Sequence, residues 1–291
     1  MKRKLVQQGN NGFTISLPKK WIVENNLKKG DEVSVISHNE NLIINHFNPN
    51  SKIKHLIINT DDNTAIRIAI SNAYRMGYDK IYCKHTDNNK LKIKELSDLL
   101  LLGFENFEED KNTIILENMF LNDIEKLDNI LYKYFLLLDN IFKKVLEEDI
   151  SQYIKEIDKY TNFFKRAINN LILFPKQKFF FWTLITELNH AAKICLKIQN
   201  IEKESENKKY CVEMKKNIYL IYSIIKNGFF DKKGNELETI RKIQQKYFED
   251  IDIEFFQKYN PIITSHFMTI IRMLYMASSP LSSIIKKEKS E

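Results

Sequence analysis

Three groups of basic residues near the N-terminus are the first candidates for chemistry. They are Lys2-Arg3-Lys4, Lys19-Lys20 and Lys28-Lys29. The second group follows Pro18, a residue that suits the first position of a helix. Because the N-terminal end of a helix is positive, lysines there do not stabilise it. Residues 1–50 carry seven Lys or Arg against four Asp or Glu, and this excess indicates a polyanion as partner.

Residue types that could catalyse a reaction occur at two other places. Asp61-Asp62 resembles a pair of catalytic carboxylates, but it precedes an expected helix that either side chain can cap. Cys83 lies on an expected strand with His85 two residues further on, and we interpret this cysteine as packing rather than as a nucleophile. The sequence has no glycine-rich phosphate loop, no GxSxG and no HExxH. We therefore expect no enzyme and no cofactor.

The composition is typical of a folded, mostly helical chain with two or three domains. It has 291 residues, 43% of them hydrophobic, with only 7 Gly and 5 Pro. Cys83, Cys195 and Cys211 fit neither a disulfide framework nor a zinc site, which indicates a reducing cytosol. No apolar run approaches the roughly 20 residues that span a bilayer, and no hydrophobic region follows the basic N-terminus. We expect a cytoplasmic protein without a membrane span.

Short strands joined by turns are predicted for the first domain, residues 1–48. The strands cover 4–8, 13–17, 32–37 and 42–47, and a short helix covers 19–25 with Trp21 as an apolar anchor. Gly9 to Gly12 predicts a turn, since glycine and asparagine tolerate positive φ. Four strands and one helical turn make a core too small to stand alone. An intertwined dimer would remedy this.

Two further domains are expected, at 53–118 and 121–285, after a linker at 48–52. The middle one predicts strands and helices in the order βαβαββ, a small two-layer α/β domain. From residue 121 the apolar residues follow helical spacing. The expected helices cover about 127–145, 150–171, 178–198, 211–226, 236–248 and 261–278, which makes the chain multidomain and mainly α. We expect the basic tail after Pro280 to be frayed.

The N-terminal segment resembles a known class of DNA-binding domain. Residues 2–47, "KRKLVQQGNNGFTISLPKKWIVENNLKKGDEVSVISHNENLIINHF", are similar to SpoVT/AbrB-type swapped-hairpin domains in the glycine turn, Leu17-Pro18-Lys19 and Gly30-Asp31-Glu32-Val33. The rest of the chain resembles archaeal phosphate-uptake-regulator proteins, which join such a domain to a PhoU-like helical domain. "NAYRMGYDKI" and "LGFENFEEDKNTIIL" are similar to their intervening α/β region.

This resemblance implies a homodimer in which hairpins of two chains interleave into one small β-barrel. Basic residues of the first strand and of the turn after the proline then lie on one face and contact double-stranded DNA. The matching residues are Arg3, Lys4, Lys19 and Lys20. Phosphate contacts position such a protein, whereas Gln7, Gln8 or Asn10 would have to read base edges. Lys28-Lys29 is interpreted as a solvated turn.

PhoU-like bundles also imply metal clusters held by E/D-x-x-x-D motifs, and here the chain departs from the family. The first motif reads Glu156-Ile-Asp158-Lys-Tyr-Thr-Asn162, with an amide in place of the second acid. On the third helix the usual Gly-Asp-His-Ala becomes Leu188-Asn189-His190-Ala191. Glu187 and His190 keep a spacing that could bind metal but are interpreted as a surface pair, and His266 has no acid one turn away. We expect no bound metal.

Three functions stay open. The first is a dimeric DNA-binding transcriptional regulator, whose helical domain senses or docks a phosphate-transport signal. The second is a protein-interaction adaptor that acts on a phosphate transporter or sensor kinase without binding DNA, as PhoU relatives lacking a DNA-binding domain do. The third is an antitoxin-like role, since the same small domain occurs in such pairs, although the long helical extension argues against it.

Overall fold

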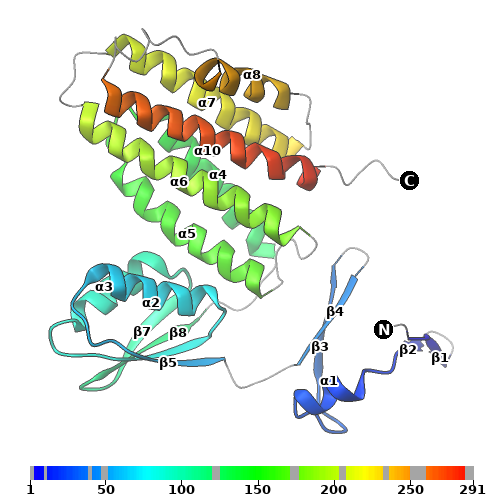
Figure 1. Cartoon of the computed structure of the whole chain (residues 1–291). Helices are drawn as coiled ribbons and strands as arrows, with labels where there is room; N and C mark the ends of the chain where they lie inside the picture. Colours follow the sequence, from blue (N-terminus) through cyan, green and yellow to red (C-terminus); the bar gives the residue numbers. More distant parts are fainter. Residues whose placement is uncertain are drawn as a thin grey trace. The chain divides into compact units, whose positions relative to one another are not determined.

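The computed structural model describes residues 3–9, 12–38, 41–46, 52–119, 125–170, 177–202, 208–231, 236–249 and 260–285. The chain divides into two compact units, Met1–Ser51 and Lys52–Glu291 (Figure 1). It is mainly helical, with a small strand region in the first unit. None of the described helices is long and apolar enough to cross a membrane.

The first unit consists of two antiparallel hairpins and a short helix. β1 (Val6–Gln8) pairs with β2 (Gly12–Thr14), and β3 (Val33–His38) pairs with β4 (Asn41–His46) as a separate two-stranded sheet. α1 (Lys19–Glu24) lies between them in the chain. The expected turn after β1 begins with Gly9 at φ 68°, and its next two residues lie outside the described part. Closure of the strands into a barrel belongs to a dimer and stays a prediction.

The second unit begins with the expected βαβαββ order. The strands are β5 (Ile53–Ile57), β6 (Lys80–Lys84), β7 (Phe104–Asp110) and β8 (Thr113–Asn118), and the sheet order is β5-β6-β8-β7. β5 and β6 are parallel, whereas β8 is antiparallel to both of its neighbours. The parallel pair requires a crossover, which α2 (Asn63–Arg75) supplies, and α3 (Lys90–Leu100) connects β6 with β7.

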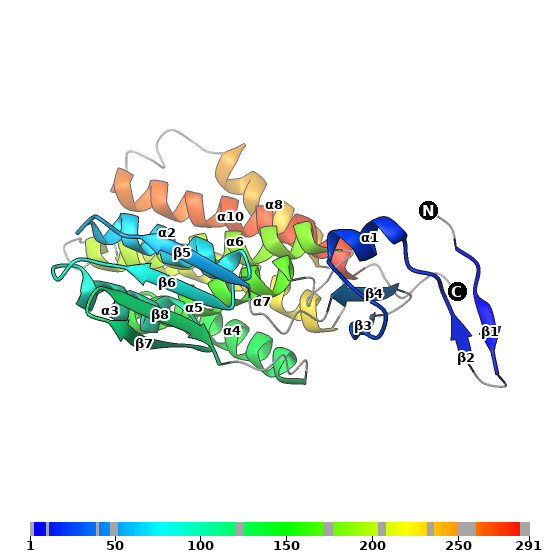
Figure 2. The same cartoon turned by 90° about the horizontal axis from the view of Figure 1, so that it is seen from below.

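Local signals in the sequence explain where α2 begins and ends. Asp62 caps the helix, because its Oδ1 accepts a hydrogen bond from the backbone N–H of Ala65 at 2.7 Å. Gly77 ends it at φ 87°, and a Cβ there would collide with the side chain of Asn170. Both helices cover the same face of the sheet, and none of the described helices of this unit covers the other face (Figure 2).

The rest of the second unit is a helical bundle. Its described helices are α4 (Glu125–Lys144), α5 (Ser151–Asn169), α6 (Lys178–Glu202), α7 (Lys208–Asp231), α8 (Leu237–Phe248) and α10 (Pro261–Ile285). α6 and α10 pack against each other along their length. The expectation of fraying after Pro280 is wrong for residues 281–285, since α10 continues through this proline. Pro280 and Leu281 are buried, and apolar burial offsets the backbone hydrogen bond that proline cannot donate.

Two separate hydrophobic cores form within the second unit. One lies between the sheet and its helices, and the other lies inside the bundle. α5 joins the two parts, because α2 and α3 both pack against it. Polar side chains cross this contact, since Asn162 Nδ2 donates to Leu100 O at 3.0 Å and Lys159 Nζ donates to Asp98 O at 2.7 Å. The contact between the α/β layer and the bundle therefore includes polar side chains.

Candidate nucleic-acid interface

The four predicted DNA-binding side chains occupy two places in the first unit, and all four are exposed. Arg3 and Lys4 lie before β1, which begins at Val6 and not at residue 4 as predicted, and Lys19 and Lys20 begin α1. None of them is withdrawn into the core, so each can reach a polyanion. Their placement on one shared face belongs to the assembled dimer and is part of the proposal below.

The start of α1 carries positive charge that the helix itself does not neutralise. Pro18 is the N-cap residue, with φ −62° and ψ 128°, and the helix begins at Lys19 as the sequence predicts. The first turn has no acidic residue and no side-chain cap. Lys20 Nζ lies 3.7 Å from Glu24 Oε1, but both side chains are largely exposed, 85% and 59%. Such a pair is worth only tenths of a kcal/mol, so both lysines remain available to an anion.

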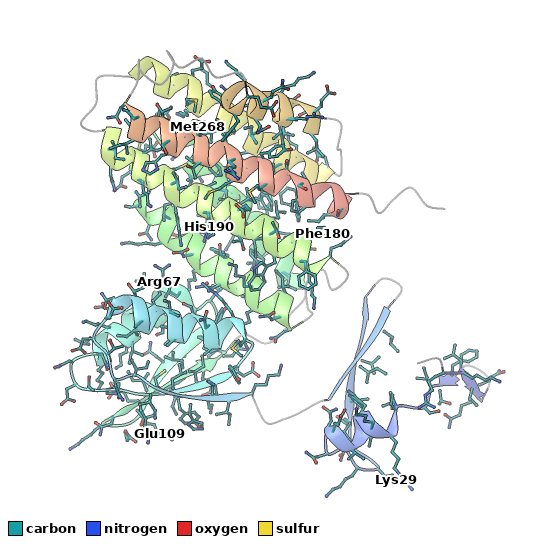
Figure 3. All side chains as sticks on the ribbon, viewed as in Figure 1. Lys29, Arg67, Glu109, Phe180, His190 and Met268 are labelled. Carbon is teal, nitrogen blue, oxygen red and sulfur yellow. The ribbon has the colours of Figure 1, made fainter. Side chains whose placement is uncertain are left out.

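Polar residues near these cations make only local contacts. Gln7 Nε2 lies 3.4 Å from Gly9 O, a long hydrogen bond, and Gln8 is exposed. Asn10, the third candidate for base contacts, lies outside the described residues. Lys28 and Lys29 are exposed beside the turn at Gly30, whose φ is 99° (Figure 3). Trp21 is half-buried, which fits an anchor for α1.

Each hairpin of the first unit exposes an apolar face. In the β1–β2 register Gln7 is opposite Phe13. Ile15 follows two residues later, so its side chain is expected on the same face of the hairpin as Phe13. Leu5, Phe13 and Ile15 are 68%, 67% and 44% exposed. In the second hairpin Val35 is opposite Ile44 and Leu42 is opposite Ser37, and Val35 and Leu42 are 53% and 59% exposed. Within one chain these faces remain in contact with water.

The first unit consequently has almost no core of its own. Leu27 is its buried hydrophobic residue among those whose side chains are described, at 9% exposed. A segment of this size needs additional burial to be stable. The exposed hairpin faces are the surfaces that could supply it.

A second cluster of charged residues lies where α2 meets α5 and α6. Asp158 Oδ2 is 2.5 Å from Arg67 Nη2, and its Oδ1 is 2.6 Å from Lys193 Nζ. Asn189 Nδ2 donates to the same Oδ1 at 3.2 Å. Burial raises the pKa of Asp158, but the neighbouring cations outweigh it and the net shift is downward. This carboxylate is thus ionised and surrounded by cations, a setting that opposes the binding of a metal ion.

Asn162, four residues after Asp158, contacts the α/β layer directly. Asn162 Oδ1 accepts hydrogen bonds from Arg75 Nε at 2.8 Å and from Nη2 at 2.6 Å. An amide at this position can accept from Arg75 and donate to the carbonyl of Leu100 at once, whereas a carboxylate could only accept. His190 is exposed on α6 (Figure 3). Asn162 is therefore part of a polar junction between α2 and α5.

Arg166 is the main polar link from the bundle to the α/β layer. Its Nη1 donates to the carbonyls of Tyr74 and Tyr78 at 3.0 and 2.7 Å, and its Nη2 lies 2.6 Å from Asp79 Oδ1. The guanidinium also lies 5.2 Å from the ring centroids of Tyr74 and Phe104. No sequence pattern singled out this residue, because its partners lie about ninety positions away in the chain.

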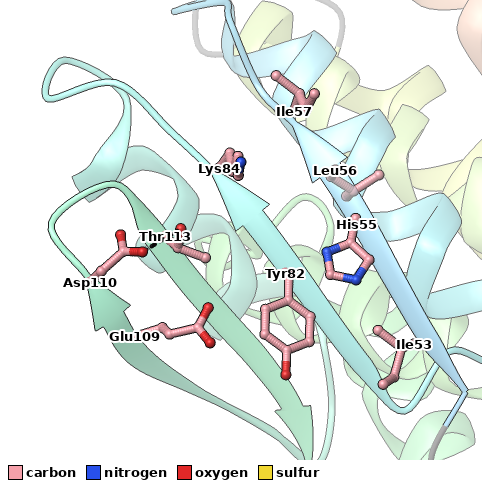
Figure 4. A pocket seen from close by; sticks show the side chains of 9 residues that line it. All are labelled: Ile53, His55, Leu56, Ile57, Tyr82, Lys84, Glu109, Asp110 and Thr113. Carbon is pink, nitrogen blue, oxygen red and sulfur yellow. Dashed lines mark hydrogen bonds between the residues drawn. The ribbon is translucent and has the colours of Figure 1, made fainter.

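The uncovered face of the sheet carries a shallow pocket of about 610 Å³. His55 and Tyr82, from β5 and β6, stack with ring centroids 4.8 Å apart. Figure 4 shows these two rings between Ile53 on one side and the carboxylates of Glu109 and Asp110 on the other. The sequence did not predict this pocket.

The residues considered for catalysis have structural contacts instead. Asp62 is the cap of α2, and the carbonyl of Asp61 accepts from Lys92 Nζ at 2.7 Å. Cys83 is fully buried, and burial raises the pKa of its thiol to about 12. At neutral pH the thiol is protonated and therefore a poor nucleophile.

Comparison with known proteins defines the class of the first unit. Residues 6–52 match the family model described as Antidote-toxin recognition MazE, bacterial antitoxin. The first unit is therefore a MazE/AbrB-like domain, of the kind found in DNA-binding regulators. The match covers less than a fifth of the 291 residues. No curated protein and no solved structure matches the chain.

Proposed function

We propose that the protein is a dimeric DNA-binding transcriptional regulator of phosphate uptake, in which a PhoU-like helical part senses or docks a signal. The observation that carries the proposal is the family match over residues 6–52, because MazE/AbrB-like domains typically bind DNA and dimerise. The phosphate assignment is supported by the resemblance of the remaining chain to phosphate-uptake regulators.

The exposed hairpin faces support the dimer. If the hairpins of two chains interleave into one barrel, the apolar side chains of both copies leave water together. Burying a side chain such as Phe13 or Leu42 contributes about 1.5–3 kcal/mol, so several of them would stabilise the dimer substantially. Assembly through these faces would make each chain's first unit dependent on its partner.

The exposed cations support the DNA contact. Arg3, Lys4, Lys19 and Lys20 from two chains would supply eight positive charges to one surface. Phosphate neutralisation releases counterions, so affinity would fall steeply with salt. These contacts would position the protein, and Gln7 or Gln8 would contact base edges. We place the protein in the cytoplasm, where the free thiols of Cys83 and Cys195 would stay reduced, and assign it no catalytic step.

DNA binding by the purified full-length protein tests the proposal. Fluorescence anisotropy with labelled duplexes is expected to show saturable binding that weakens with salt. The double variant Lys19→Glu/Lys20→Glu should bind at least tenfold more weakly. Lys28→Glu/Lys29→Glu is the matched control, since it makes the same charge change in the same unit on residues interpreted as a solvated turn. Equal losses in both variants would contradict the assigned site.

Absence of DNA binding in the wild-type protein would refute the proposal. Co-purification of a phosphate-transport protein or a sensor kinase from native membranes would then support the adaptor function. An antitoxin-like role is a further candidate, which the description of the matching family favours. In that case a small partner protein, encoded beside this one, would form a stable complex with the full-length chain.

A further inference from the structure

Cations outnumber acids where α2 meets α5 and α6. Four basic side chains gather there, and we call them the junction cluster: Arg67, Arg75, Lys165 and Lys193. Asp158 is the acid that contacts two of them, and Glu187 lies near His190 at the edge. The cluster with both acids carries a net charge of +2, with His190 neutral. An excess of this kind inside a contact between two packed layers calls for an explanation.

The carboxylate of Asp158 forms ion pairs with only two of the four cations of the junction cluster. Asp158 is shared by Arg67 and Lys193, whereas Arg75 contacts only neutral amides, Asn162 and, at 3.5 Å, Asn72. Lys165 Nζ lies 5.0 Å from the centroid of the Trp182 ring. Among the residues that the structure describes, no carboxylate lies within ion-pair distance of Arg75 or Lys165.

The uncompensated charge is held at a cost in free energy. Burial, together with the nearby charges of Arg75 and Lys193, lowers the pKa of Lys165 to about 8, although Asp158 opposes the shift. Burial also lowers the pKa of Arg75. Both shifts mean that the folded chain disfavours the charged forms. A negative ion beside these groups would reverse the effect.

The junction is open to solvent on one side. The side chains of Arg67 and Lys193 are 43% and 36% exposed, and His190 is exposed beside them (Figure 3). On α2, the hydroxyl of Ser71 lies one turn from both Arg67 and Arg75 and is buried without a hydrogen-bond partner. A small anion can thus approach Arg67 and Lys193 from water.

We propose that the junction cluster binds a small phosphate-type oxyanion between α2, α5 and α6. Arginine presents paired N–H donors that match the oxygens of such an anion, and lysine adds a point charge. A tetrahedral oxyanion offers oxygens in several directions, so it can contact side chains from three helices at once. The site stands by itself, and its assignment as the signal site of the regulator rests on the function proposed above.

Calorimetric titration of the full-length protein with sodium phosphate tests the site without DNA. At pH 7, with ionic strength held constant by sodium chloride, saturable binding is expected, together with a rise in melting temperature. Lys165→Gln and Arg75→Gln should each weaken binding at least tenfold. The matched controls Lys133→Gln and Arg272→Gln, at exposed positions of α4 and α10, should bind like the wild type.

The design separates loss of the site from loss of the fold. Lys165→Arg keeps the charge and should retain binding, and circular dichroism checks that every variant is folded. Absence of saturable heat in the wild type would overturn the proposal, and so would equal affinity in Lys165→Gln and the wild type. Because the titration contains no DNA, a negative result would leave the DNA-binding proposal to its own test.

Discussion

Replacing Phe13 by serine tests whether the exposed face of the β1–β2 hairpin is a dimer interface. In a single chain Phe13 is 67% exposed. Substitutions at such exposed positions usually change stability by less than about 0.5 kcal/mol. If two chains interleave, however, the same side chain is buried in both copies. The two arrangements therefore predict very different effects of Phe13→Ser.

The size of the effect follows from the area that a partner would cover. A phenylalanine side chain buries about 150–250 Å², so covering its exposed two thirds removes roughly 100–170 Å² from water. At about 25 cal/mol per Å² this amounts to roughly 3 kcal/mol per chain and about 6 kcal/mol per dimer. Because about 1.4 kcal/mol is tenfold, we expect the dimer dissociation constant to rise by about 10⁴.

Sedimentation velocity over a wide range of protein concentrations measures this constant. Leu91→Ser is the matched control, because Leu91 is 70% exposed on α3 of the second unit. It should leave the monomer–dimer equilibrium unchanged. A Phe13→Ser protein that dimerises like the wild type, or a wild type that is monomeric at all concentrations, would refute the interleaved barrel.

Three further predictions concern the cations. Lys19→Gln/Lys20→Gln should reduce the slope of log K against log salt for DNA binding by about 3.6. Four of the eight phosphate contacts in the dimer are lost, and each contributes about 0.9 to the slope. Fluorescence anisotropy between about 50 and 200 mM salt measures this slope. Arg166→Met should lower the free energy of unfolding by about 2–4 kcal/mol in urea titrations, because it removes a donor to the partly buried carbonyl of Tyr78 and removes stacking on two rings. The pKa of Lys165 is lowered to about 8 in the folded chain. Its charge therefore opposes folding below pH 8. This penalty disappears as the pH rises toward the pKa that Lys165 has in the unfolded chain. Lys165→Met should therefore raise stability at pH 7 and do so much less at pH 10, as urea titrations at both values would show.

Local signals made most of the elements predictable. Asp62 as a cap and Gly77 at the helix end fix α2, and both act through neighbours within a few residues. The helical spacing of apolar residues located the bundle helices, because one face of each must be buried. The prediction that the chain frays after Pro280 was wrong. Proline disfavours a helix because it removes one backbone hydrogen bond, but the burial of the surrounding helix outweighs this loss.

The candidate site was predictable only in part. The N-terminal lysines stand out because two cations follow a proline at a helix start, and the structure leaves them exposed. Arg67, Arg75 and Arg166 carried no such signal. Their partners, such as Asp158 and Asn162, are about ninety residues away. The spacing of residues along the chain therefore cannot predict these contacts.

By itself the sequence determined the type and order of the elements and the class of the first unit, because caps, turns and apolar periodicity act between neighbouring residues. Only the tertiary structure decided which charges meet. Packing α2 on α5, which itself packs against α6, gathers four cations near one carboxylate, and two of them pair with it. That outcome depends on distances between helices far apart in the chain, and Coulomb interactions follow distance in space rather than separation in sequence.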